Sequence, residues 1–223
     1  MKKKLLVISA LYLSMSGVSQ ANLIDRGNGM IYDDVLDVTW LQDANYAQTS
    51  GFDVDGKMSW ADALSWTDNL IFEGYDDWRL PTVIPLNGTS FQNSYSYDGT
   101  TDLGYNISNT NSELGYMFYE NLGNTGYFDA SGVATGCGPC LTNTGLFNNI
   151  NNFGFWFGQE FASTLALAME FSTVGGLQNR LDKDNEFYAW AVRSGDVSTV
   201  PVPAGIWLFG TGLAGFVTLR RKR

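Results

Sequence analysis

The sequence contains no histidine, and this absence excludes several classes of chemistry at once. A Ser-His-Asp triad, a Cys-His pair and any zinc or haem site that uses imidazole are all ruled out. Paired carboxylates could still support glycoside hydrolysis, but no pair stands out among the 23 acidic residues. The sequence therefore predicts a protein that is not an enzyme.

Positive charge is also scarce in the body of the chain. Seven of the 13 Lys and Arg residues lie in two terminal clusters, at 2–4 and 220–223. Residues 22–196 keep six of them against all 23 Asp and Glu residues, a net charge of −17. Because such a field repels polyanions, we expect no nucleic acid or heparin-like partner.

The first 21 residues are typical of a secretory signal peptide. A lysine cluster precedes a mostly apolar stretch, 5–18, and Ser19 and Ala21 supply the small residues that signal peptidase requires. An ordinary buried first helix is the alternative interpretation. The segment that follows, 22–196, is long enough to bury its own core and is predicted to form a single domain.

The last residues, 197–223, predict a membrane anchor with a sorting motif. The uncharged stretch 202–219 would span about 27 Å as a helix, and the basic cluster 220–223 would stay cytoplasmic. The whole tail resembles a PEP-CTERM sorting signal in its Val-Pro-x-Pro-Ala variant. The motif residues are Val200, Pro201, Pro203 and Ala204.

The sorting resemblance implies a Gram-negative envelope protein that is handled by an exosortase-type transpeptidase. Such a protein would first be anchored in the inner membrane and would then reach the cell surface or the extracellular matrix. The resemblance also implies an association with exopolysaccharide and biofilm. A plain single-span anchor is the alternative.

Periodicity and capping signals predict two helices and several strands in the body. A capping-box spacing at Ser59 and Asp62 starts a helix that runs to Leu70, and a second apolar stripe predicts a helix over 112–122. Residues 86–111 are predicted to be loop or irregular sheet, and residues 123–152 are predicted to be loop. The predicted strands cover 30–32, 35–41, 153–157, 164–172 and 187–193.

Four segments in order, 38–44, 59–64, 74–82 and 187–193, resemble the Lcl C-terminal domain family. Segment 112–124 resembles the exported, PEP-CTERM-tailed branch of that family. The family is similar to C-type-lectin-like domains. The resemblance implies one compact α+β domain with two main helices, short antiparallel strands and long loops. Some relatives act as adhesins for sulfated polysaccharide, a ligand that does not suit the acidic body.

The motif residues are interpreted as structural. Arg79 and Arg193 are expected to be held by carboxylates, with Asp76 or Asp77 as partners, and ligand binding is the alternative. The tryptophans of the motifs are expected in the core, with sugar stacking as the alternative. The structural set comprises Trp40, Trp60, Asp77, Trp78, Arg79, Pro81, Trp190 and Arg193.

The two cysteines, Cys137 and Cys140, flank Gly138 and Pro139, which gives the Cys-Gly-Pro-Cys pattern of a thioredoxin redox motif. Redox catalysis needs a helix start that lowers the pKa of the first thiol, and the residues that follow are a poor helix start. In an exported protein, a local disulfide that pins a loop is the favoured interpretation. Free or metal-binding thiols and redox catalysis are the alternatives.

Two acidic turns gather oxygen donors of the kind that calcium prefers. Neither turn fits an EF-hand loop. Solvated turn acids are the alternative, since turns favour Asp and Asn in any case. The candidate calcium ligands are Asp53, Asp55, Asp182, Asp184 and Glu186.

Together these features predict an exported, non-catalytic protein of the cell surface or matrix. Carbohydrate, bound with calcium, is its candidate ligand, and signal peptidase and the exosortase-type transpeptidase are its processing partners. A purely structural envelope protein is the alternative. A glycan-active or disulfide-redox enzyme is a further alternative.

Overall fold

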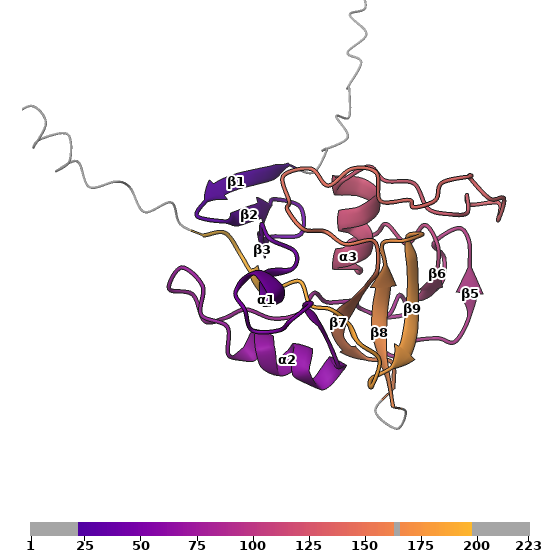
Figure 1. Ribbon diagram of the computed structural model, residues 1–223. Coiled ribbons are helices and arrows are strands. Elements are labelled where there is room, and N and C mark those ends of the chain that lie inside the picture. The colour runs from indigo at the N-terminus through magenta and orange to yellow at the C-terminus, as the bar shows by residue number, and fades with distance from the viewer. Residues whose placement is uncertain (1–21, 163–165, 198–223) are drawn as a thin grey trace, which may run out of the picture.

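The computed structural model describes residues 22–162 and 166–197, which form two antiparallel-dominated sheets and short helices (Figure 1). The smaller sheet has the strand order β1-β2-β3-β11, and all of its pairs are antiparallel. Its strands are β1 (Leu23–Gly27), β2 (Met30–Asp33), β3 (Val38–Leu41) and β11 (Val192–Ser194).

The larger sheet has the order β4-β10-β7-β8-β9-β6-β5. Its three longest strands, β7 to β9, form a continuous antiparallel meander, while β10 pairs with β7 and β5 with β6 in parallel. The strands are β4 (Lys57–Met58), β5 (Tyr95–Ser96), β6 (Leu103–Gly104), β7 (Gly154–Glu160), β8 (Leu167–Ser172), β9 (Leu177–Asp182) and β10 (Phe187–Tyr188).

Both predicted helices form: the first begins at its predicted cap, and the second begins at the start of its predicted range with a cap that was not predicted. The Ser59 hydroxyl accepts the N–H of Asp62 at the start of α2 (Trp60–Asp68), and the Ser112 hydroxyl accepts the N–H of Gly115 at the start of α3 (Glu113–Tyr116). These caps satisfy amides that a helix start otherwise leaves unpaired. The second helix continues as a π-helical turn, Met117–Asn121, and a short α1 (Tyr46–Thr49) was not predicted.

The prediction of one strand over 187–193 is wrong. Its two ends form separate strands, β10 in the larger sheet and β11 in the smaller one. The intervening residues 189–191 are buried and carry the chain from one sheet to the other. Here the alternating pattern arises because the linking residues are buried on both sides of the chain. It does not mark one buried face of a single strand.

Other strand predictions are confirmed with shifted bounds. The strand predicted over 35–41 begins only at Val38, because a turn with positive φ at Asp37 precedes it. The polar strand β9 was missed, since its Gln178, Asn179 and Arg180 lack an apolar alternation. The fold is therefore α+β, with more strand than helix.

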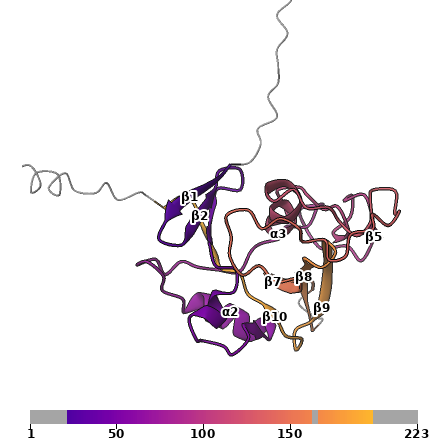
Figure 2. The same cartoon turned by 45° about the horizontal axis from the view of Figure 1, so that its top comes forward.

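The core lies between the two sheets and the helices, and aromatic rings fill it. Trp190 is central: its ring centroid lies 4.8 Å from those of Trp40 and Phe147, and its indole N–H donates to the carbonyl of Leu41. This packing fixes the sheets, and the edge strand β5 of the larger sheet lies on the side of the molecule away from α2 (Figure 2).

Within the described residues, no helix is long and apolar enough to cross a membrane. The predicted signal peptide, 1–21, lies outside those residues. Most of the predicted sorting signal also lies outside them, and this part contains Val200, Pro201, Pro203 and Ala204. Both stay predictions.

Candidate functional site

Aromatic side chains gather at the β5–β6 edge of the larger sheet. We call this surface the tyrosine face; it consists of Tyr95, Tyr97, Tyr105, Tyr127 and Phe128. Exposed fractions of 49%, 39% and 44% for Tyr95, Tyr97 and Tyr127 show that much of the cluster is open to solvent. Scattered surface apolar residues are normal, whereas a contiguous aromatic cluster is a candidate interaction site.

The rings of the tyrosine face hold one another in defined orientations. Tyr97 and Tyr105 stack with an interplanar angle of 6° and a centroid distance of 6.0 Å. Phe128 contacts both of them edge-on, at 5.0 and 5.1 Å. Such offset and edge-to-face pairs are the arrangements that aromatic quadrupoles favour. The face is therefore a packed surface rather than a set of independent side chains.

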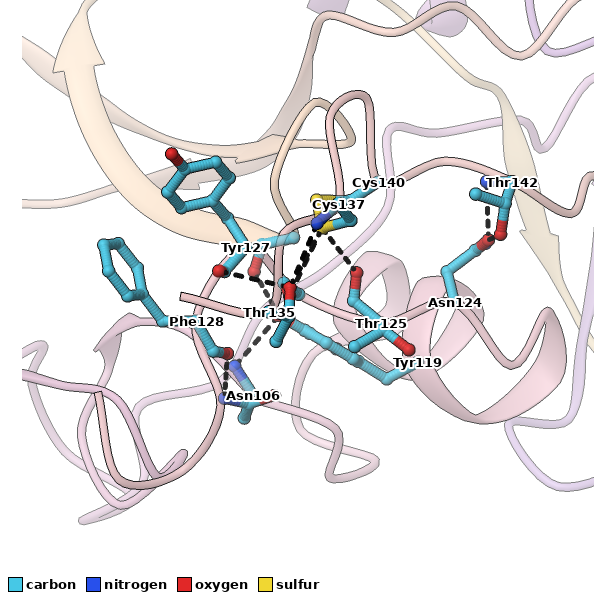
Figure 3. Close-up of a disulfide and its surroundings, with 12 residues drawn as sticks. Asn106, Tyr119, Asn124, Thr125, Tyr127, Phe128, Thr135, Cys137, Cys140 and Thr142 are labelled. Carbon is cyan, nitrogen blue, oxygen red and sulfur yellow. Dashed lines mark hydrogen bonds between the residues drawn. A yellow bond between two sulfur atoms is a disulfide. The ribbon is translucent and has the colours of Figure 1, made fainter. Parts of the chain in front are cut away.

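Asn106 joins the two chain segments that carry these rings (Figure 3). Its amide donates to the carbonyl of Tyr97 at 2.7 Å and to that of Phe128 at 2.9 Å. The Tyr119 hydroxyl accepts the N–H of Asn106 and donates to the carbonyl of Gly176. These hydrogen bonds tie the tyrosine face to the π-helical turn and to the β8–β9 connection.

A disulfide closes the second of these segments. Cys137 and Cys140 are bonded, with their Cα atoms 4.9 Å apart, in the loop that follows the Tyr127–Phe128 segment (Figure 3). The Thr135 hydroxyl donates to Gly126, and the N–H of Cys140 donates to Val174 near the end of β8. Because loop rather than helix follows Cys140, the pair lacks the setting of a redox motif and serves to hold a loop.

Replacing Cys137 and Cys140 with serine together should loosen this segment without unfolding the domain. Closing so short a loop contributes about 2 kcal/mol in the chain-entropy account. We expect faster hydrogen exchange at the amides of Tyr127 and Thr135, which bond to Gly175 and Tyr127, while β8 amides keep their protection. Unchanged exchange at both amides would contradict a pinning role for the disulfide.

The tyrosine face combines protonated phenol groups with a neighbouring carboxylate. Burial among the rings raises the pKa of Tyr95 and of Tyr105, so both stay protonated at neutral pH. The Thr100 hydroxyl donates to Asp98 at 2.6 Å and lowers the pKa of that carboxyl. The surface thus offers ring faces, phenol hydroxyls and a carboxylate, which suit non-covalent binding.

Residues 29–193 match the family model described as the Lcl C-terminal domain. The chain belongs to the Lcl C-terminal domain family. The match covers the larger sheet, the smaller sheet except for β1 and the last residue of β11, and the whole tyrosine face, and it confirms the family predicted from the sequence motifs. No curated protein and no solved structure matches the chain. Membership points to a secreted or surface protein and assigns no activity.

The arginines of the Lcl C-terminal domain make two bidentate ion pairs. Arg193 donates to both oxygens of Asp77 at 2.7 and 2.9 Å. The prediction that Asp76 or Asp77 holds these arginines is confirmed for Arg193 and wrong for Arg79, because Arg79 instead bonds both oxygens of Glu113 at the start of α3. Both pairs join segments distant in the sequence, so these arginines fix loops of the fold.

The other motif residues of the Lcl C-terminal domain lie in or against its core. Trp40, Trp78 and Trp190 are buried. Trp60 is half-buried: its indole donates to the carbonyl of Phe157, and the Lys183 ammonium lies 4.5 Å from its ring centroid. The carbonyl of Pro81 accepts the N–H of Gly158. With these indoles engaged, exposed tyrosines are the better candidates for sugar stacking.

The candidate calcium ligands act as turn acids. Asp53 accepts the N–H groups of Asp55 and Gly56, and Asp55 pairs with Lys57 at 2.7 Å. In the second turn, Asp182 accepts the N–H of Asp184. No group of three or more Cys, Asp or Glu side chains in the described ranges is placed to hold a metal ion. Calcium, including a role for Glu186, stays a prediction.

Proposed function

We propose that this protein is exported and binds carbohydrate at the cell surface or in the extracellular matrix without catalysing its breakdown. Its ends carry the patterns expected for signal peptidase and for an exosortase-type transpeptidase. The body is a single α+β domain of the Lcl C-terminal family, for which we propose a C-type-lectin-like arrangement. Exopolysaccharide of a Gram-negative envelope would be its natural ligand.

The tyrosine face is the observation that carries this proposal. Sugars present apolar C–H faces and many hydroxyls, and exposed tyrosines offer a ring face and a hydrogen-bonding tip together. Tyr95 and Tyr97 are exposed, and the less exposed rings of Tyr105 and Phe128 pack edge-on against them. Because the disulfide and Asn106 hold the supporting segments in place, little conformational entropy would be lost on binding.

Substituting Tyr95→Ala and Tyr97→Ala together should weaken glycan binding about tenfold or more, which corresponds to about 1.4 kcal/mol. The reason is the loss of two exposed stacking surfaces. A glycan array followed by isothermal titration with the best ligand measures the effect. Phe153→Ala is the matched control, since Phe153 is similarly exposed (41%) but lies beside β10, at the other side of the sheet.

Two outcomes would overturn the proposal. One is a protein that binds no glycan on the array, with or without added calcium. The other is equal loss of affinity in the tyrosine variant and in Phe153→Ala, because the ring at Phe153 lies outside the tyrosine face.

A purely structural role in the envelope is a second candidate, and one surface favours it. Phe52 and Ile71 are exposed beside a hollow of about 210 Å³ whose lining includes Trp66 and Leu70. Apolar surface of this kind is typical of contacts between proteins. A protein that binds no glycan, but whose loss weakens cohesion of the matrix, would favour this role.

A further inference from the structure

Every cation of the described residues is already engaged. Five of the six form ion pairs, and the sixth, Arg180, lies 4.9 Å from the ring centroid of Phe161. The pairs are Arg26–Asp196, Lys57–Asp55, Arg79–Glu113, Lys183–Glu160 and Arg193–Asp77. The described surface therefore offers no cluster of free positive charge with which to hold a sulfated or uronate sugar.

The tyrosine face lies in the most cation-poor part of the chain. Residues 80–179 contain no Lys and no Arg, and every ring of the face comes from this range. Two exposed carboxylates directly follow its rings in sequence: Asp98 after Tyr97, and Asp129 after Phe128. No basic residue lies in either segment, and neither carboxylate takes part in an ion pair among the described residues.

We propose that the tyrosine face selects polysaccharide that carries free amino groups over neutral and acidic polysaccharide. This inference rests on the proposed carbohydrate-binding function and names the class of sugar. A protonated amino group is attracted to the face of an aromatic ring and to a carboxylate beside it. An acidic sugar is repelled by the same carboxylates and by the net charge of −17 on the body.

The carboxylates at this face can be neutralised without changing the local hydrogen bonds. Asp98 accepts from the amide and hydroxyl of Thr100, and Asp129 accepts from the amides of Ser131 and Val133. In each case one side-chain oxygen accepts, and an asparagine retains such an oxygen. The double substitution Asp98→Asn and Asp129→Asn therefore removes charge while the turns are kept.

The test compares two oligosaccharides of equal length, a β-linked glucosamine oligomer with free amino groups and its fully N-acetylated form. Titration of the full chain at about 50 mM salt should show at least tenfold tighter binding of the amino form, and the preference should shrink at high salt. A polyuronate of similar length should not bind. In the Asp98→Asn and Asp129→Asn variant, the preference should fall to threefold or less.

A matched control separates the local carboxylates from the total charge. Asp25→Asn and Asp34→Asn remove the same charge from the smaller sheet, where each aspartate also accepts a backbone N–H, and the preference should stay. Equal affinity for both sugars, tighter binding of polyuronate, or equal loss in the control would overturn the inference while leaving carbohydrate binding intact. Binding of no sugar would overturn both.

Discussion

Glu113→Ala should lower the free energy of unfolding by about 3 kcal/mol, because it breaks a buried ion pair by removing one partner. The Glu113 side chain is 9% exposed and accepts two hydrogen bonds from Arg79, at 2.8 and 2.9 Å. It also accepts the N–H of Thr82. The substitution leaves a partly buried guanidinium and a backbone amide without their acceptor.

Urea unfolding of the full chain measures this loss. Asp196→Ala is the control, because it removes the partner of Arg26 in an ion pair whose carboxylate is 40% exposed. Pairs at the surface contribute about 1 kcal/mol or less. Equal losses in the two variants would show that burial of the Arg79–Glu113 pair adds no stability.

This ion pair also shows where sequence reasoning stops. The capping signal at Ser59 and the apolar stripe over 112–122 predicted the two helix starts, because both signals involve only residues three or four positions apart. The partner of Arg79 lies 34 residues away, and neighbouring aspartates were the natural but wrong choice. The same limit applies to 187–193, where one alternating pattern serves two sheets. Local rules predict local structure, and long-range pairing needs the fold.

The tyrosine face was missed for a related reason. Sugar stacking was considered only for the tryptophans, as the alternative to a place in the core, and the fold engages the indoles of the motifs in its core or, for Trp60, against Lys183. The tyrosines come from two predicted loops, whose approach depends on Asn106, at φ 57°, and on Gly132, where a Cβ would lie 3.0 Å from the Tyr97 ring. The only sequence signal was three tyrosines in a polar stretch, 95–105.

The free energy of unfolding should fall as the pH rises above about 5, because the carboxyl of Glu170 is buried. Its carboxyl is 2% exposed on the central strand β8, between the register partners Trp156 and Asn179, and it has no hydrogen-bond partner among the described residues. It is confined by Gly154, where a Cβ would lie 2.6 Å from Oε1, and by the Phe187 ring over the same glycine. Burial raises the pKa of Glu170 to about 8, against an ordinary value of 4.5.

The sign follows from proton counting. Between pH 4.5 and pH 8 the folded chain keeps the proton on Glu170, whereas the unfolded chain releases it, so stability falls as the pH rises through this window. The loss approaches about 1.4 kcal/mol for each pH unit, or about 3 kcal/mol by pH 7. Glu170→Gln cannot ionise and should remove this part of the slope, although its amide adds a cost that does not vary with pH.

Urea unfolding at pH 5, 6, 7 and 8 measures how the free energy of unfolding changes with pH, and this change, not the absolute stability, is the test. The wild type should lose about 3 kcal/mol more than Glu170→Gln across this range. Glu120→Gln, at an exposed position of the π-helical turn, should keep the wild-type slope. Parallel curves for wild type and Glu170→Gln would mean that the carboxyl is already ionised in the folded protein. The one basic residue on the neighbouring strands β7 and β9 is Arg180, which is the register partner of Met169 and therefore faces the opposite side of the sheet from Glu170. Water would then have to reach the carboxyl.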